Sequence, residues 1–119
     1  ADSINAILLF DNDITAVINV DWMSPYKEHR FSVLGSNGSL IFDDTKDWKE
    51  KLCLNESKID NELRIINGKS TYIDLKEEQP LKKELESFLN CIKRNIQPLT
   101  NQEEALMVQK VMSMIEDNI

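Results

Sequence analysis

The chain has 119 residues, of which 41% are hydrophobic and 29% charged, and its formal net charge is −7. This length and composition fit one globular domain with a modest core. The negative charge argues against nucleic acid and against an anionic membrane surface as partners, because both call for a basic face. No apolar run approaches the roughly 20 residues that span a bilayer. The chain begins at Ala1 without a basic-then-apolar leader, so we expect a cytoplasmic protein and interpret this sequence as a piece of a longer one.

The first part of the chain alternates apolar and polar residues, which predicts strands. Two such segments, Ser3 to Phe10 and Ile14 to Trp22, flank the turn cluster 11–13. We expect them to pair as an antiparallel hairpin. One face of this hairpin is expected to carry Ile4, Ala6, Leu8, Phe10, Ile14, Ala16, Ile18, Val20 and Trp22.

A second hairpin follows a loop over residues 23–29. Strand-like runs at Arg30–Leu34 and Ser39–Phe42 flank Gly35-Ser36-Asn37-Gly38. Asn-Gly between such runs favours a tight turn, because both residues accept positive φ. Shorter strands are predicted at Lys51–Leu54, Leu63–Ile66 and Thr71–Leu75, and the polar stretch 55–62 is expected to separate the first two.

Helical spacing replaces alternation after Pro80, a residue that suits the first turn of a helix. We predict helices over about 80–95 and 101–118. Arg94-Asn95 is expected to close the first helix. Thr100 followed by Glu103 has the pattern of a capping box that opens the second.

Strands followed by helices predict an α+β fold, namely a mostly antiparallel open-faced sheet with two C-terminal helices packed on one face. We expect a single domain over residues 1–119, without a Rossmann domain. A half-apolar open sheet face usually marks an interaction surface. We therefore predict a homo-oligomer, or docking on missing sequence, through a face that carries Ile7, Leu9, Val17, Leu34 and Ile41 together with Asn5, Asn19 and Asp21.

Few residues suggest chemistry. His29 is the only histidine, and without an evident carboxylate partner we interpret it as a surface or interface residue. Trp22, Tyr26, Lys27 and Arg30 have side chains that suit an anionic or sugar ligand. The alternative for the two cations is a solvated loop or an ion pair across a dimer.

Acidic residues and thiols have plain interpretations. Asp43-Asp44 could ligate a hard cation, but we favour the simple end of a strand in solvent. Cys53 and Cys91 are too few for a disulfide framework; we expect half-buried thiols in a reducing compartment, with a mutual disulfide as the lesser alternative. With three glycines and no G-x-G-x-x-G, the chain is predicted to hold no nucleotide-binding loop and so no cofactor-binding residue. We also expect no catalytic and no metal-binding residue in this chain.

The order of these segments resembles the C-terminal domain of the Gfo/Idh/MocA oxidoreductases. The resemblance lies in AILLFDNDITAVINVDWMSPYKEHRFSVLGSNGSLIFDDTKDWKEKL, PLKKELESFLNCIKRNIQPLT and NQEEALMVQKVM. It covers nearly the whole chain and is weakest between Asn55 and Leu75.

This resemblance implies an NAD(P)-dependent dehydrogenase of sugars, sugar nucleotides or polyols, in which an N-terminal Rossmann domain binds NAD or NADP. It also implies that the open sheet forms the subunit interface and one wall of the substrate site. Trp22, Lys27 and Arg30 fall on family-like positions near the sheet edge and are candidates for substrate or interface contacts. The family's dinucleotide loop and catalytic lysine are missing, so we predict that this chain alone is inactive.

A second hypothesis remains open. The chain could act as a stand-alone, non-catalytic interaction module that pairs through its sheet. A stand-alone small-ligand binder that uses Trp22, Tyr26, Lys27 and Arg30 is the third.

Overall fold

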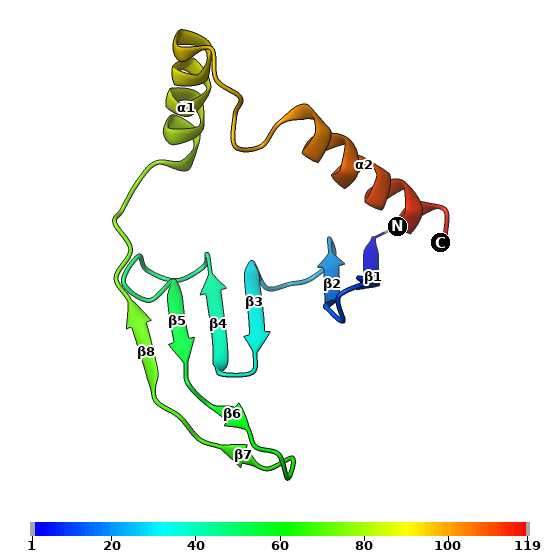
Figure 1. Ribbon diagram of the computed structural model, residues 1–119, viewed down its shortest axis with the longest axis vertical. Coiled ribbons are helices and arrows are strands. Elements are labelled where there is room, and N and C mark those ends of the chain that lie inside the picture. Colours follow the sequence, from blue (N-terminus) through cyan, green and yellow to red (C-terminus); the bar gives the residue numbers. More distant parts are fainter. Residues whose placement is uncertain (1, 119) are drawn as a thin grey trace. The chain divides into compact units, whose positions relative to one another are not determined.

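The computed structural model describes residues 2–118 of the chain. These form two compact units, one from residues 2–23 and 78–118 and the other from residues 24–77. Hydrogen bonds join the strands into three antiparallel ladders, and two helices follow them in the sequence (Figure 1). The predicted α+β fold class, with antiparallel strands and two C-terminal helices, is confirmed.

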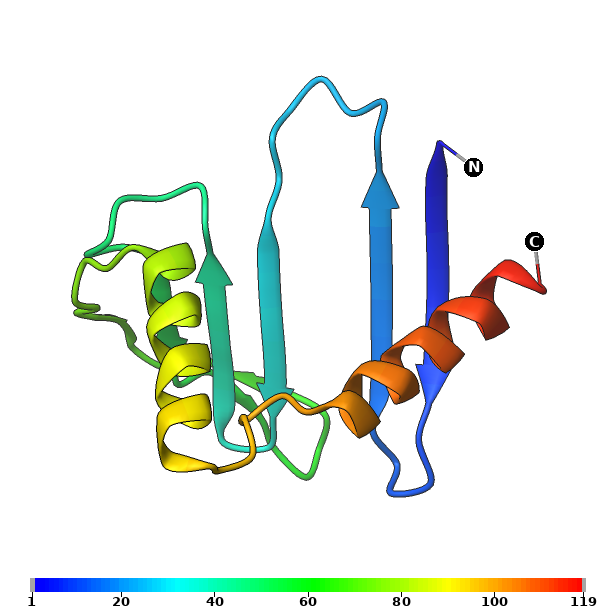
Figure 2. The same cartoon turned by 90° about the horizontal axis from the view of Figure 1, so that it is seen from above.

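The first unit contains a hairpin of β1 (Ser3–Leu9) and β2 (Thr15–Asp21). Its register runs from Ser3 opposite Asp21 to Leu9 opposite Thr15, and Figure 2 shows the two strands as blue antiparallel neighbours. Asp13 adopts a left-handed conformation with a φ of 60° in the connecting turn, which an aspartate tolerates better than most residues. The predicted first hairpin is therefore confirmed.

Alternation along this hairpin separates two faces, because residues directly opposite each other share a face. Ile4, Ala6, Leu8, Ala16 and Ile18 are half-buried and lie on one face, as predicted. The other face carries Ile7, Leu9 and Val17, whose exposed fractions are 68%, 80% and 65%. The sequence predicted that this second set lies together on the open face, and the register of the hairpin confirms that the three residues share a face.

The second unit contains a four-stranded ladder in the order β3-β4-β5-β8. Its strands are β3 (Arg30–Gly35), β4 (Gly38–Asp43), β5 (Leu52–Asn55) and β8 (Ser70–Ile73), and every neighbouring pair is antiparallel. A small separate ladder joins β6 (Lys58–Ile59) to β7 (Ile65–Ile66). Figure 1 shows β3, β4, β5 and β8 side by side.

The turn between β3 and β4 differs in detail from the prediction. Gly35 pairs with Gly38, so Ser36 and Asn37 form the two-residue turn. Gly38 has a φ of 146°, whereas Asn37 is not among the positive-φ residues of the described chain. The hairpin is as predicted, but a single glycine, and not an Asn-Gly pair, supplies the positive φ.

The strand β6 lies inside the stretch 55–62 that was interpreted as a polar separator, and that interpretation was wrong. The Asp60 carboxylate organises this short hairpin. It accepts hydrogen bonds from the backbone N–H groups of Glu62 and Arg64, each at 2.9 Å, and from Arg64 Nε at 3.1 Å. The Arg64 N–H is the main cause that lowers the pKa of Asp60. A local side-chain cap therefore forms a turn where the composition suggested a loop.

The helix α1 (Pro80–Arg94) begins with its proline in the first turn, as predicted. It ends at Asn95, which is left-handed with a φ of 50°. The Ile96 N–H donates to the Cys91 carbonyl and the Asn95 N–H donates to that of Ile92. This is the pair of bonds that closes many helices.

The helix α2 (Gln102–Glu116) is capped by Asn101, and not by Thr100 as predicted. Asn101 Oδ1 accepts from the N–H groups of Glu103 and Glu104 at 2.9 and 3.1 Å. Asparagine and threonine both make good caps. The cap lies one residue later than predicted because two adjacent residues were both suitable. Among residues 2–118, none of the helices is long and apolar enough to cross a membrane.

Candidate functional site

A cluster of charged side chains lies at one end of the β3-β4-β5 ladder. We call it the strand-end cluster: His29, Arg30, Asp43, Asp44 and Lys51. The paired strands β3 and β4 end at Arg30 opposite Asp43. One step further, the Asp44 N–H donates to the His29 carbonyl at 2.9 Å, and the Asp43 N–H donates to the Lys51 carbonyl at 2.8 Å. The backbone thus brings three chain segments together at this point.

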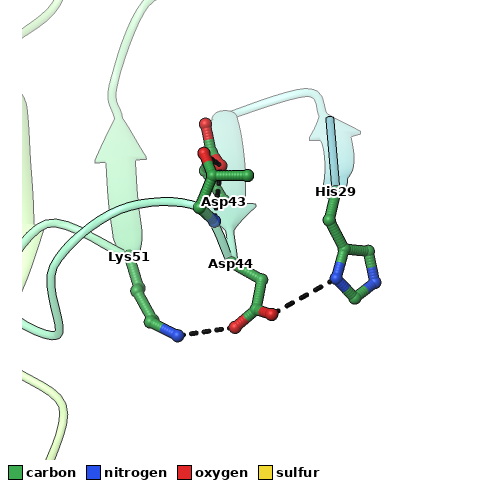
Figure 3. A network of polar contacts seen from close by, with 5 residues as sticks. His29, Asp43, Asp44 and Lys51 are labelled. Carbon is green, nitrogen blue, oxygen red and sulfur yellow. Dashed lines mark hydrogen bonds and ion pairs between the residues drawn. The ribbon is translucent and has the colours of Figure 1, made fainter. Parts of the chain in front are cut away.

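Asp44 lies at the centre of the cluster, between two cationic or potentially cationic side chains (Figure 3). Its Oδ1 accepts from Lys51 Nζ at 2.5 Å, and its Oδ2 lies 3.3 Å from His29 Nδ1. The Lys51 hydrogen bond, with a smaller contribution from His29, holds the pKa of the Asp44 carboxyl below its ordinary value. Asp44 is therefore an ionised acceptor at neutral pH.

Lys51 differs from the other members because its side chain is only 12% exposed. Its ammonium lies 4.4 Å from the centre of the Trp48 ring, a distance that permits a cation–π interaction. Its position is thus fixed by an aromatic face and by a carboxylate. Lys51 lies between the loop over residues 44–50 and the start of β5.

Asp43 makes a separate set of contacts on the neighbouring residue. Its Oδ1 accepts from the Thr45 hydroxyl at 2.6 Å and from the Thr45 N–H at 3.0 Å, and its Oδ2 lies 3.4 Å from Arg30. The Thr45 hydroxyl is the main cause that lowers the pKa of Asp43. Asp43 and Asp44 do end β4, as expected, but both carboxylates are bound by protein donors and are not simply solvated.

The interpretation of His29 as a residue without a carboxylate partner was wrong. His29 and Asp44 are separated by 15 positions in the sequence, and only the hairpin register brings them together. Arg30 lies opposite Asp43 in an antiparallel pair. His29, which precedes Arg30, must therefore lie beside Asp44, which follows Asp43. The sequence of the β3–β4 turn would have predicted the contact between His29 and Asp44 if the register of that turn had been known.

The other predicted site residues have different surroundings. Trp22 is 87% exposed, and its N–H donates to the Asp2 carbonyl at 2.8 Å. Lys27 is exposed in the loop before β3, and Arg30 bonds Asp43. Trp22 belongs to the first unit and the two cations to the second. Their role in substrate or interface contacts stays a prediction.

The register also defines the faces of the four-stranded ladder. Leu34 lies opposite Ser39 and Ile41 lies opposite Ser32, so the two apolar residues share a face of β3 and β4, as predicted. Cys53 and Tyr72 extend this face across β5 and β8. Leu34 is 82% exposed and Tyr72 is 58% exposed. The face is half-apolar and open within its unit.

The described residues of this chain do not fit a dinucleotide-binding site. A pyrophosphate site needs glycines at the start of a helix, where free N–H groups face the phosphates. Here Gly35 and Gly38 flank a hairpin turn, and Gly68 lies between two strands. At the start of α2, the Asn101 side chain occupies two N–H groups and Glu103 and Glu104 add negative charge.

Metal ligands and thiols add no further site in the described part of the chain. Within residues 2–118, no group of three His, Cys, Asp or Glu side chains is placed to hold a metal ion. Cys53 and Cys91 are free and half-buried, in agreement with the interpretation as separate thiols. A hollow of about 410 Å³ in the first unit is lined by β1 and the end of α2, with Ser3, Asn5 and Asn118 as its polar residues. These side chains are uncharged.

Comparison with models of protein families gives a match over nearly the whole chain. A family model described as the C-terminal alpha/beta domain of an oxidoreductase family, Gfo/Idh/MocA, matches residues 1–116. Neither a curated protein nor a solved structure matches the chain.

Proposed function

Because the chain belongs to the Gfo/Idh/MocA oxidoreductase family, as its C-terminal domain, we propose that it is the substrate-side and oligomerisation part of an NAD(P)-dependent dehydrogenase. The substrate class that we propose is a sugar, a sugar nucleotide or a polyol. The observation that carries the proposal is the family match over residues 1–116. The exposed apolar side chains on the open faces support it.

The oligomerisation role rests on those faces. Ile7, Leu9 and Val17 on the β1–β2 hairpin and Leu34 on β3 are each at least 65% exposed. Burial of one such side chain against a partner stabilises a complex by about 1.5–3 kcal/mol. Asn5, Asn19 and Ser32 lie among them and supply hydrogen-bonding groups. We propose that the partner is a second copy of the chain.

The substrate role is assigned to Trp22, Lys27 and Arg30. An exposed indole offers an apolar face to a sugar ring, and an arginine offers a fork of donors to hydroxyl or phosphate oxygens. Arg30 is held at the strand end by Asp43, which fixes its starting position. In this proposal each of the three residues contacts either the substrate or a neighbouring subunit.

The cofactor role is assigned to sequence outside this chain. When bound, NAD or NADP supplies the hydride acceptor or donor, and an N-terminal Rossmann domain would hold it. The residues of this chain only bind and orient the substrate. The chain alone is accordingly inactive in hydride transfer, and a cytoplasmic, reducing setting suits its two free thiols.

Light scattering across a concentration series tests the proposal. We expect a dimer or larger assembly of the 119-residue chain. A monomer at every concentration would contradict the oligomerisation role. Hydride transfer above background by this chain with NAD or NADP and a polyol would contradict the assignment of catalysis to the missing part.

The hypothesis of a stand-alone interaction module predicts the same oligomer but a different coding sequence upstream of this segment. Coding sequence with G-x-G-x-x-G directly upstream supports the dehydrogenase proposal. A start codon immediately before this segment supports the module instead.

A further inference from the structure

His29 and Asp44 form a pair that is fixed through the backbone and through the side chains (Figure 3). The Asp44 N–H donates to the His29 carbonyl at 2.9 Å, and Oδ2 of Asp44 lies 3.3 Å from Nδ1 of His29. The other carboxylate oxygen is bound by Lys51, whose side chain is 12% exposed. The carboxylate therefore has little freedom to rotate away from the imidazole.

This contact determines where the imidazole carries its proton. An ionised carboxylate only accepts hydrogen bonds, so Nδ1 of the neutral ring must be the donor to Asp44. Nε2 then keeps its lone pair and becomes an acceptor. The His29 side chain is 70% exposed, and its second ring nitrogen faces away from Asp44 in Figure 3. The lone pair is open to a ligand.

We propose that His29, Asp44 and Lys51 form a proton-acceptor site, in which His29 Nε2 takes a proton from a small neutral molecule with a weakly acidic O–H or C–H group. His29 is the residue that touches the ligand. Asp44 and Lys51 are positioning residues, because they act through the imidazole. The proposal does not rest on the dehydrogenase function, since it needs neither the cofactor nor a second domain.

The surrounding charges leave this arrangement intact. Arg30 and Asp43, the nearest charged neighbours on β3 and β4, pair with each other at 3.4 Å. Lys27 and Glu28 precede His29 in an exposed loop. Asp44 is thus the carboxylate that contacts the ring, and it is balanced by Lys51 on its other oxygen.

The tautomer of His29 tests the positioning role directly. The chain has one histidine, so a proton–nitrogen correlation spectrum shows a single imidazole. At about pH 8.5, where an ordinary imidazole is neutral, we expect the Nδ1–H form in the wild type. Asp44→Ala should move the ring to the Nε2–H form that free imidazole groups prefer. Glu28→Ala is the matched control, because it removes an exposed carboxylate next to His29 in the sequence but outside the cluster, and it should leave the tautomer unchanged.

A cofactor-free probe tests proton acceptance. In 5-nitrobenzisoxazole, Nε2 would take the ring C–H proton, the electron pair of that bond would form the nitrile, and the N–O bond would break to release a phenolate. We expect the wild type to eliminate the probe severalfold faster than Asp44→Ala. His29→Gln should fall to the background rate, and Glu28→Ala, outside the cluster, should retain the wild-type rate.

Two results would overturn the proposal: a wild-type histidine in the Nε2–H form, or an elimination rate that His29→Gln leaves unchanged. If Asp44→Ala does not fold, Lys51→Met takes its place. Methionine keeps a long apolar side chain against Trp48 while removing the ammonium that holds Asp44, and it should produce the same shift of tautomer. The wild-type spectrum alone decides the first point.

Discussion

Gly38 and Asn55 approach each other so closely that no side chain fits between them. A Cβ atom built on Gly38 would lie 2.5 Å from the Asn55 carbonyl oxygen, well inside van der Waals contact. The φ of 146° at Gly38 is also one that residues with a side chain rarely adopt. Two independent features therefore require glycine at the start of β4.

Gly38→Ala should destabilise the chain by about 1–3 kcal/mol, through backbone strain together with the clash. Gly35→Ala is the matched control, because a Cβ there meets only the Gly38 carbonyl oxygen at 3.6 Å. It should change stability by no more than about 0.5 kcal/mol. Urea unfolding of the two variants gives both values, and equal losses would contradict the argument.

The Asn101 cap predicts a loss of helix stability. Asn101→Ala removes the acceptor for the Glu103 and Glu104 N–H groups and should cost about 0.5–2 kcal/mol. Thr100→Ala should have little effect, because Thr100 lies one residue before the cap. Circular dichroism during thermal unfolding measures both. A larger loss for Thr100→Ala would restore the capping box that the sequence predicted.

The pKa of Asp43 predicts how stability depends on pH. This pKa lies below the ordinary value of 3.8, mainly because of the Thr45 hydroxyl. A lowered carboxyl pKa stabilises the folded state above the ordinary value, and the stabilisation disappears as the pH falls through the folded-state pKa. Thr45→Val should therefore be less stable than wild type at neutral pH.

The difference between Thr45→Val and wild type should shrink as the pH falls below about 4. Urea titrations at a series of pH values measure it. Asp43→Asn serves as the reference, since the Thr45 hydroxyl cannot lower a pKa that is absent. A difference that stays constant down to low pH would mean that the hydroxyl acts by packing and not through the Asp43 charge.

Charged substitutions on the open faces should weaken self-association. Leu34→Asp and Ile7→Asp replace side chains that are 82% and 68% exposed. In the proposed oligomer these side chains are buried against the partner. Loss of one such contact should raise the dissociation constant by about tenfold or more. Leu99→Asp is the control, because Leu99 is 92% exposed in the segment between the helices. An equal effect of Leu99→Asp in light scattering would mean that the charge acts without regard to position.

The elements of this fold follow from local signals in the sequence. Alternation located β1 and β2 almost to the residue, and Pro80 and Asn95 located both ends of α1. Such signals work because backbone sterics and capping act within a few residues. The strand β6 escaped detection because a side chain, Asp60, supplies the turn and the strand has only two residues.

The site could not be predicted in the same way, because it depends on register. If Asn37 and Gly38 had formed the two-residue turn, Ser36 would pair with Ser39 and Lys46 would lie opposite His29. The observed turn at Ser36 and Asn37 instead sets Asp44 beside His29. A shift of one residue in the turn thus exchanges a cation for a carboxylate next to the imidazole.

The division of the chain into two units also has a consequence for its synthesis. Residues 24–77 form one unit without interruption, whereas the other unit combines residues 2–23 with residues 78–118. On a ribosome, the continuous unit can complete its ladder as soon as β8 has emerged. The β1–β2 hairpin is made before the continuous unit, yet its own unit is complete only after α2 has been made. A chaperone that shields this hairpin would act on the nascent chain during that interval.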